Sequence, residues 1–173
     1  MTIARRVLYR FLRATGLATG LPVPAVDQGP GMCGPASLKA VLAYYGVEKT
    51  EDELKQLSGA TEEDGVPPEG IVRAAKALGF RAYFKQNASL EELKGWLGKK
   101  VPVIIDWYST DEGHYSVLTA IQDGNVYMKD PELGTEREMP LDKFERVWFD
   151  FDSPSKEHKG LGSRQIVVIL PPA

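Results

Sequence analysis

The spacing of apolar residues changes about halfway along the chain. In the first half they recur every three or four positions, which predicts amphipathic helices. In the second half they alternate with polar residues or run continuously, which predicts half-buried and fully buried strands. Helices followed by an antiparallel sheet indicate the α+β class, with N-terminal helices packed on the sheet.

Capping residues and turn residues set the limits of the predicted elements. Thr50-Glu-Asp-Glu53 and Ser89-Leu-Glu-Glu92 are capping boxes, and Asp123-Gly124 is a hairpin turn. The predicted helices are 34–45, 50–57, 67–78, 89–97 and 140–146. The predicted strands are 80–85, 101–108, 114–121, 126–129, 147–151 and 164–170, the last of which closes the sheet. Residues 152–163 are polar and contain glycine, so we expect a loop there.

The first 20 residues are expected to form a separate unit, a basic amphipathic helix and a connector, ahead of one domain at 21–173. Arginines alternate with apolar residues at helical spacing over residues 1–15. They interrupt the unbroken apolar core that a secretory signal needs. Two interpretations stay open: the apolar face packs on the domain, which we favour, or it binds a membrane surface or a partner such as a separate transporter.

Composition narrows the classes of function. The 173 residues are 43% hydrophobic and carry a net charge of −3, so their charge gives no reason to expect nucleic-acid binding. A single cysteine excludes an intramolecular disulfide and a multi-cysteine metal site, and we expect neither a metal nor a cofactor. No apolar run approaches the roughly 20 residues that a membrane span needs. We therefore expect a cytoplasmic protein, with membrane association only through its first helix.

The single cysteine lies in a glycine-rich segment directly before a predicted helix. Cys33 follows Gln28-Gly-Pro-Gly-Met, and a helix N-terminus lowers the pKa of a thiol placed there. Gly31 leaves the backbone open to a bound substrate, and Gln28 can direct an amide donor to the same point. These features favour a nucleophile, although a lone cysteine is more commonly a small buried apolar residue.

A thiol nucleophile needs a base and a group that orients the base. The chain has two histidines. His114 begins a predicted strand, whereas His158 lies in the polar loop and is most simply solvated. Asp130 ends the strand that follows the hairpin turn, and pairing about that turn brings it beside His114. The alternatives are that His114 is a structural histidine and that Asp130-Pro131 is only a turn.

These segments together resemble the bacteriocin-processing cysteine peptidases. The resemblance runs from about Val26 to Trp148 and is carried by four motifs: Cys33-Gly-Pro-Ala-Ser-Leu with its upstream glutamine, Pro102-Val-Ile-Ile-Asp-Trp107, His114-Tyr-Ser-Val-Leu118, and Asp130-Pro131 with Gly134. Members of that family are papain-like enzymes that cut leader peptides after a double-glycine motif. Many are fused to peptide-exporting transporters.

The resemblance implies a role for each matching residue. Cys33 is the nucleophile, His114 the general base and then acid, and Asp130 the residue that orients His114. Gln28 and the backbone N–H of Cys33 form the oxyanion hole. The chain departs from the family pattern at Met32, where an acidic residue is common, and in the spacing of Gln28, which lies one position closer to the cysteine.

We therefore expect a cysteine endopeptidase that acts on an extended peptide through a thioester acyl-enzyme. Trp107 and Tyr108 are candidates for the walls of a narrow cleft that admits glycine, although aromatic residues at the end of a strand are more often core residues. Two other functions stay open. One is amide hydrolysis or acyl transfer by the same triad, and the other is a peptidase-like module that binds a peptide without cutting it.

Overall fold

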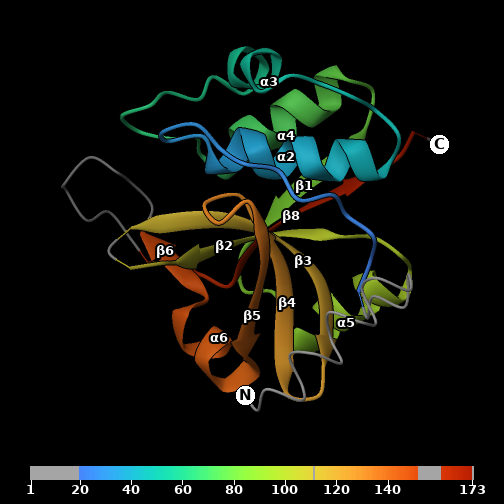
Figure 1. The fold of residues 1–173 in the computed structure, drawn as a ribbon, viewed down its shortest axis with the longest axis vertical. Helices are drawn as coiled ribbons and strands as arrows, with labels where there is room; N and C mark the ends of the chain where they lie inside the picture. The colour runs from blue at the N-terminus through green and yellow to red at the C-terminus, as the bar shows by residue number, and fades with distance from the viewer. Residues whose placement is uncertain (1–19, 111, 152–160, 173) are drawn as a thin grey trace.

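The computed structural model describes residues 20–110, 112–151 and 161–172 (Figure 1). The predicted basic helix at 1–15 and His158 therefore lie outside the described residues. The same holds for most of the loop expected at 152–163. The structure leaves the expected division into 1–20 and 21–173 as a prediction.

The described residues contain a six-stranded antiparallel sheet in the order β1-β8-β2-β3-β4-β5. Its strands are β1 Arg81–Lys85, β2 Val103–Tyr108, β3 Gly113–Gln122, β4 Asn125–Asp130, β5 Thr135–Pro140 and β8 Gln165–Leu170. A separate pair is formed by β6 Phe149–Phe151 and β7 Leu161–Ser163.

Helices cover both faces of this sheet. One face carries α2 Cys33–Tyr44, α3 Glu51–Ser58 and α4 Pro68–Ala77, and the other carries α5 Leu90–Gly98 and α6 Leu141–Val147 (Figure 1). Each face has its own cluster of buried apolar side chains. The prediction of an α+β fold, with N-terminal helices on an antiparallel sheet, is confirmed.

Local sequence signals account for the ends of the helices. At the start of α3 the Thr50 hydroxyl accepts from the N–H of Glu53, and the Glu53 carboxylate accepts from the N–H of Thr50, so the predicted capping box is complete. At α5 only one half forms. Ser89 accepts from the N–H of Glu92, while the Glu92 carboxylate pairs with Lys85 on β1 at 2.7 Å.

Three details of the sheet differ from the sequence-based expectation. Strand β5 was not predicted, because only Met139 of its residues is buried and the rest show no apolar alternation. Residues 161–163 form β7 and not loop. The last strand, β8, does not close the sheet; it lies between β1 and β2 and is buried along most of its length.

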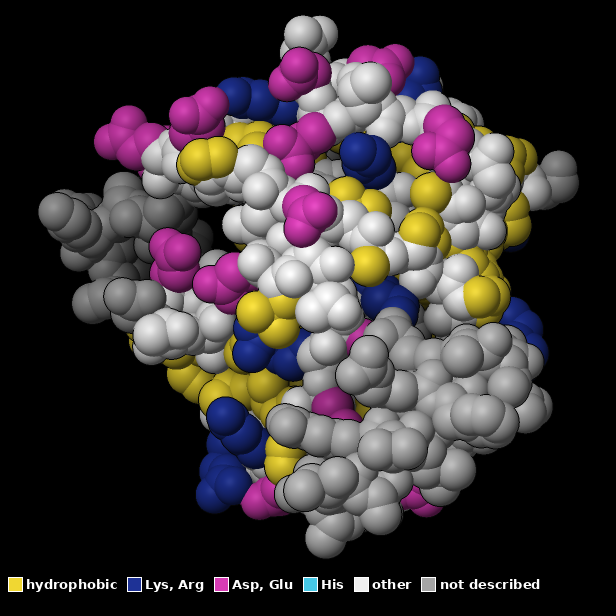
Figure 2. Space-filling view, viewed as in Figure 1, with side chains coloured by type: hydrophobic (Ala, Val, Ile, Leu, Met, Phe, Trp, Pro, Cys, Tyr) yellow, Lys and Arg dark blue, Asp and Glu magenta, His cyan; other side chains and the backbone are white. Residues whose placement is uncertain are grey.

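On the face shown in Figure 2, acidic side chains and lysine or arginine side chains are interspersed over the helical layer. Among the described residues, no helix has both the length and the apolar character needed to cross a membrane.

Candidate active site

Cys33 is the first residue of α2, and its thiol is free and half-buried. The chain enters the helix through a tight turn in which the N–H of Met32 donates to the carbonyl of Gly29 at 3.1 Å. Met32 occupies the N-cap position but supplies no capping side chain, and it is buried. The thiol therefore lies at the positive end of a helix dipole.

Gly31 lies in this turn, and its backbone packs against the backbone of Glu62. Its φ is +68°, and a Cβ on it would lie 2.5 Å from the backbone oxygen of Glu62. The loop at 61–65 thus occupies the space into which a side chain at position 31 would project, so close packing of two backbones requires a glycine here. The expectation that Gly31 leaves the backbone open to a substrate stays a prediction.

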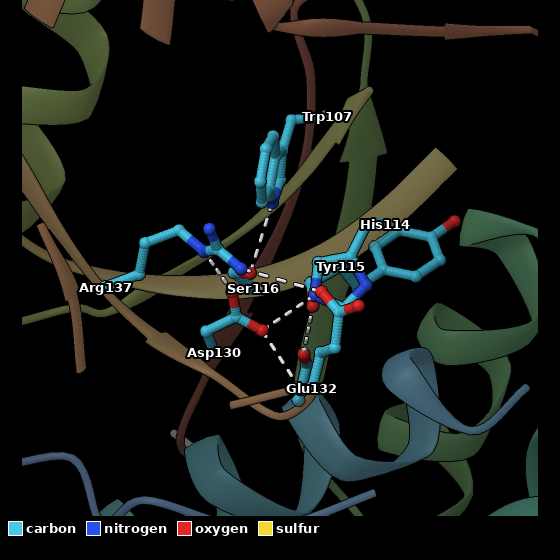
Figure 3. A network of polar contacts seen from close by, with 8 residues as sticks. Trp107, His114, Tyr115, Ser116, Asp130, Glu132 and Arg137 are labelled. Carbon is cyan, nitrogen blue, oxygen red and sulfur yellow. Dashed lines mark hydrogen bonds and ion pairs between the residues drawn. The ribbon is translucent and has the colours of Figure 1, made fainter. Parts of the chain in front are cut away.

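His114 and Asp130 come together across the hairpin of β3 and β4. The Nε2 atom of His114 lies 2.8 Å from Oδ1 of Asp130, and both side chains are buried (Figure 3). His114 is near the start of β3 and Asp130 is the last residue of β4, and the pairing Val117↔Lys129 sets their approach. Because Nε2 is engaged by Asp130, Nδ1 is the ring nitrogen left for the thiol of Cys33.

Arg137 contacts the second oxygen of Asp130. Its Nε donates to Oδ2 of Asp130, while Oδ1 also accepts from the N–H of Glu132 at 3.0 Å (Figure 3). The guanidinium lies 5.3 Å from the ring centroid of Trp107. Sequence reasoning missed Arg137 because it lies on β5, the strand whose polar sequence gave no periodic signal.

Burial and hydrogen bonds act in opposite directions on this pair. Burial alone lowers the pKa of His114, but hydrogen bonds to Asp130 and Cys33, and the charges of both, raise it to about 9. Burial raises the pKa of Asp130, but hydrogen bonds to His114 and Arg137 hold it below its ordinary value. At neutral pH, Asp130 is therefore a carboxylate, and His114 carries a proton within hydrogen-bond reach of Cys33.

Gln28 is fixed by its backbone beside Asp130. Its N–H donates to the carbonyl of Pro131 at 3.1 Å, which ties the segment before Cys33 to the turn after β4. The side-chain Oε1 of Gln28 is buried and has no hydrogen-bond partner among the described residues. The next residue, Gly29, donates its N–H to the carboxylate of Glu51 at 3.2 Å, a contact that the sequence did not suggest.

The two aromatic candidates at the end of β2 differ in position. Trp107 is 3% exposed, its indole N–H donates to Oγ of Ser116 at 3.1 Å, and its ring meets that of His114 edge-on at 5.6 Å. It therefore offers a substrate almost no surface and packs against the histidine. Tyr108 is half-buried and stacks on Phe149 at 5.2 Å.

A metal ion has little to bind here. One ligand atom each from His114, Asp130 and Glu132 lies within 4.8 Å of the others. However, the nearest atoms of His114 and Asp130 are already bonded to each other, and Arg137 neutralises the carboxylate. The donor set fits a hydrogen-bonded acid–base pair better than a cation site. Together with the thiol of Cys33, the arrangement is suited to acyl transfer.

Comparison with known proteins gives a family. The model of the Peptidase C39 family matches residues 25–151. An uncharacterized protein of Methanothermobacter thermautotrophicus is 37% identical over 102 residues, which make up 59% of this chain and 66% of that protein. The Lactococcin-G-processing and transport ATP-binding protein LagD of Lactococcus lactis is 30% identical over 134 residues, 73% of this chain but 18% of LagD. This chain thus matches only part of each relative.

The fold is also similar to that of a solved structure, a double glycine motif protease from an AMS/PCAT transporter in complex with the leader peptide. The two share a TM-score of 0.67 and 23% sequence identity, over 88% of this chain and 94% of the other. At this identity the likeness concerns the fold.

Proposed function

This chain belongs to the Peptidase C39 family, and from that premise we propose that it is a cysteine endopeptidase that cuts a leader peptide after a double-glycine motif. The observation that carries the proposal is the buried hydrogen bond between His114 and Asp130, with the thiol of Cys33 in reach of the same imidazole. The names of LagD and of the leader-peptide complex support the choice of substrate.

The proposed reaction begins with the thiolate of Cys33 and the imidazolium of His114. The sulfur attacks the carbonyl carbon of the scissile bond, and the negative charge passes to the carbonyl oxygen. The side-chain amide of Gln28 and the backbone N–H of Cys33 donate to this oxyanion. When the C–N bond breaks, His114 gives its proton to the leaving amine, and the acyl group stays on sulfur as a thioester.

Water completes the cycle. Neutral His114 takes a proton from the water that attacks the thioester, and breakage of the C–S bond returns the thiolate beside an imidazolium. Asp130 stays ionised throughout and holds Nε2 of His114, so that the other ring nitrogen faces the sulfur. Tyr108, opposite Gly113 at the end of β2, stacks on Phe149, and we propose that this aromatic pair contacts an extended peptide.

The test is cleavage of a synthetic peptide that contains a double-glycine leader, with products identified by mass spectrometry. Cys33→Ala and His114→Ala should each abolish cleavage after the second glycine. The chain's other histidine supplies the matched control, since His158→Ala should leave the rate unchanged. Tight binding without cleavage would overturn the peptidase proposal in favour of a binding module. Hydrolysis of small amides but not of the peptide would favour an amidase.

The proposed activity implies a kind of partner and a cellular location. LagD is named as a processing and transport protein, so we propose that this chain acts on a peptide destined for a transporter. We also propose a cytoplasmic location, consistent with a free thiol at the site. Contact of residues 1–20 with a membrane or a transporter stays a prediction.

A further inference from the structure

We propose that Arg137 is a positioning residue of this site: its guanidinium fixes the carboxylate of Asp130 and, through it, the imidazole of His114. This inference rests on the proposed function, because it assigns Arg137 a task within the same triad. It concerns a residue from a strand that contributes none of the other site residues, β5.

The contacts leave the Asp130 carboxylate one orientation. Its side chain has no exposed surface, so every acceptor position must be satisfied within the protein. Oδ1 accepts from Nε2 of His114 at 2.8 Å and from the N–H of Glu132 at 3.0 Å. Oδ2 accepts from Nε of Arg137. Without Arg137, half of the carboxylate would be buried and unsatisfied, and rotation would take Oδ1 away from the histidine.

Arg137 also supplies a charge that does not change during the reaction. A buried carboxylate without a counter-charge tends to take up a proton. His114 cannot hold Asp130 ionised at every stage, because it loses its proton in one half of the proposed cycle. The guanidinium stays protonated at all working pH values. Arg137 therefore keeps Asp130 a hydrogen-bond acceptor while the charge of His114 alternates.

The guanidinium is itself held in place. It lies over the ring of Trp107 at 5.3 Å, and its Nη2 is 3.5 Å from the Glu132 carboxylate. Trp107 in turn meets the ring of His114 at 5.6 Å (Figure 3). The charged groups facing Asp130 are thus His114 from β3, Arg137 from β5 and Glu132 from the turn between β4 and β5. Lysine lacks the planar group that stacks on Trp107 while it donates sideways.

A second arginine on the same half of the chain offers a matched control. Arg146 pairs with Asp142 on α6, where the two side chains are 72% and 76% exposed. Such an exposed pair contributes little to stability. In the pair of Arg137 and Asp130 the side chains are 26% and 0% exposed. Arg146→Met therefore removes a guanidinium whose hydrogen bonds go to Asp142 and to no residue of the site.

The test is the rate at which iodoacetamide alkylates Cys33, measured from pH 4 to pH 10 in the full chain. In Arg137→Met the pKa of Asp130 rises, so its neutral form persists to higher pH and stabilises the imidazolium less. The acidic limb of the alkylation profile should therefore move to higher pH. The plateau should fall by up to about 100-fold because the imidazole is misplaced. Arg137→Lys keeps the positive charge, so its acidic limb should lie at the same pH as that of the wild type. Its plateau should stay low, as in Arg137→Met. Arg146→Met should follow the wild type.

Thermal unfolding of each variant separates positioning from a merely structural role. A lowered melting temperature with an unchanged pH profile of the folded protein would overturn the proposal. An Arg137→Lys profile identical to that of the wild type in limb and plateau would overturn the claim for the guanidinium, even if Arg137→Met does not fold. If His114→Ala changes the alkylation rate of Cys33 but Arg137→Met does not, only the role of Arg137 is overturned. If His114→Ala leaves the alkylation rate unchanged, the proposed function itself is overturned.

Discussion

The backbone of Glu62 passes so close to Gly31 that a Cβ on the glycine would lie 2.5 Å from the Glu62 carbonyl oxygen. The loop that carries Glu62 is closed by two backbone hydrogen bonds between Thr61 and Gly65, of 2.9 and 3.0 Å. It therefore resists displacement. The turn that leads into Cys33 is shaped by this loop, two residues before the thiol.

Gly31→Ala should destabilise the protein and slow alkylation of Cys33. The substitution carries the cost of a left-handed backbone, about 1–2 kcal/mol, and adds a clash with backbone atoms that we place at about 1–3 kcal/mol. The clash can be relieved only by moving the turn before Cys33 or the loop at 61–65. Urea unfolding and the rate of iodoacetamide labelling measure the two effects.

The control is Gly124→Ala in the hairpin turn between β3 and β4. Gly124 has a φ of +75°, similar to the +68° of Gly31, but no atom lies within 4 Å of its Cβ position. It should therefore bear the backbone cost alone and leave labelling unchanged. Equal losses of stability in the two variants would show that the contact with Glu62 has no energetic weight.

Gln28→Ala should separate peptide cleavage from thiol reactivity. Loss of an oxyanion donor lowers kcat by about 10²–10³-fold in comparable sites. Alkylation of Cys33 by iodoacetamide develops no oxyanion at a peptide carbonyl, so its rate should stay within a few-fold of the wild type. The backbone bond from Gln28 to Pro131 does not depend on the side chain, which limits structural damage. A parallel loss of both activities would argue against the oxyanion role.

The sequence predicted best those parts of the site that depend on local signals, namely helix caps, glycines and the hairpin turn. The hairpin at Asp123-Gly124 brings His114 toward Asp130, because antiparallel pairing about a known turn sets approximately which residues are opposite. A register shift between Leu118 and Ala120 then changes the pairing by one residue, which the sequence did not indicate. Capping boxes and glycines fixed the helices to within one or two residues. The position of Cys33 followed from the start of α2.

Arg137 was beyond reach of the same reasoning. Its strand is at the edge of the sheet, and a strand that buries a single apolar side chain carries no period-two pattern. The place of β8 in the middle of the sheet also depends on long-range pairing with β1 and β2, which no local pattern records. The role of Arg137 and the position of β8 both depend on contacts between segments far apart along the chain, which is why local patterns did not predict them.

Gly34→Ala and Gly95→Ala should change stability in opposite directions. Gly95 lies inside α5, where alanine is favoured over glycine by about 1 kcal/mol, and Gly34 is the second residue of α2, where that figure is an upper bound. At Gly95 the added Cβ meets nothing within 4 Å, so the unfolding free energy should rise by about 0.5–1 kcal/mol.

At Gly34 the Cβ would overlap Cγ1 of the buried Val66 and lie 3.3 Å from Ile71. Overpacking of this kind costs about 1–3 kcal/mol, which exceeds the gain in helix propensity. Because Gly34 follows Cys33, alkylation should slow as well. Urea unfolding of the two variants decides the point, and stabilisation by Gly34→Ala would mean that α2 is packed less tightly than the structure has it.

The proton on His114 should respond to the thiol of Cys33. The pKa of His114 is raised to about 9 because the hydrogen bonds and charges of Asp130 and Cys33 outweigh burial, which lowers it. In Cys33→Ala the interactions with Cys33 that raise the pKa of His114 vanish, while burial, which lowers it, remains. The pKa should therefore fall by about one unit or more. NMR titration of the two histidines measures it, with His158→Ala to assign the signals.

The same proton links stability to pH. The folded pKa of His114, about 9, lies above the roughly 6.5 of an unfolded histidine. Its stabilisation is therefore complete below about pH 6.5 and is lost as the pH rises through 9. Between pH 8 and pH 10, under reducing conditions, the unfolding free energy of the wild type should therefore fall more steeply than that of His114→Gln. Cys33, the tyrosines and the lysines are present in both proteins, so the comparison follows the proton on His114. Parallel slopes would mean that folding does not raise the pKa of His114.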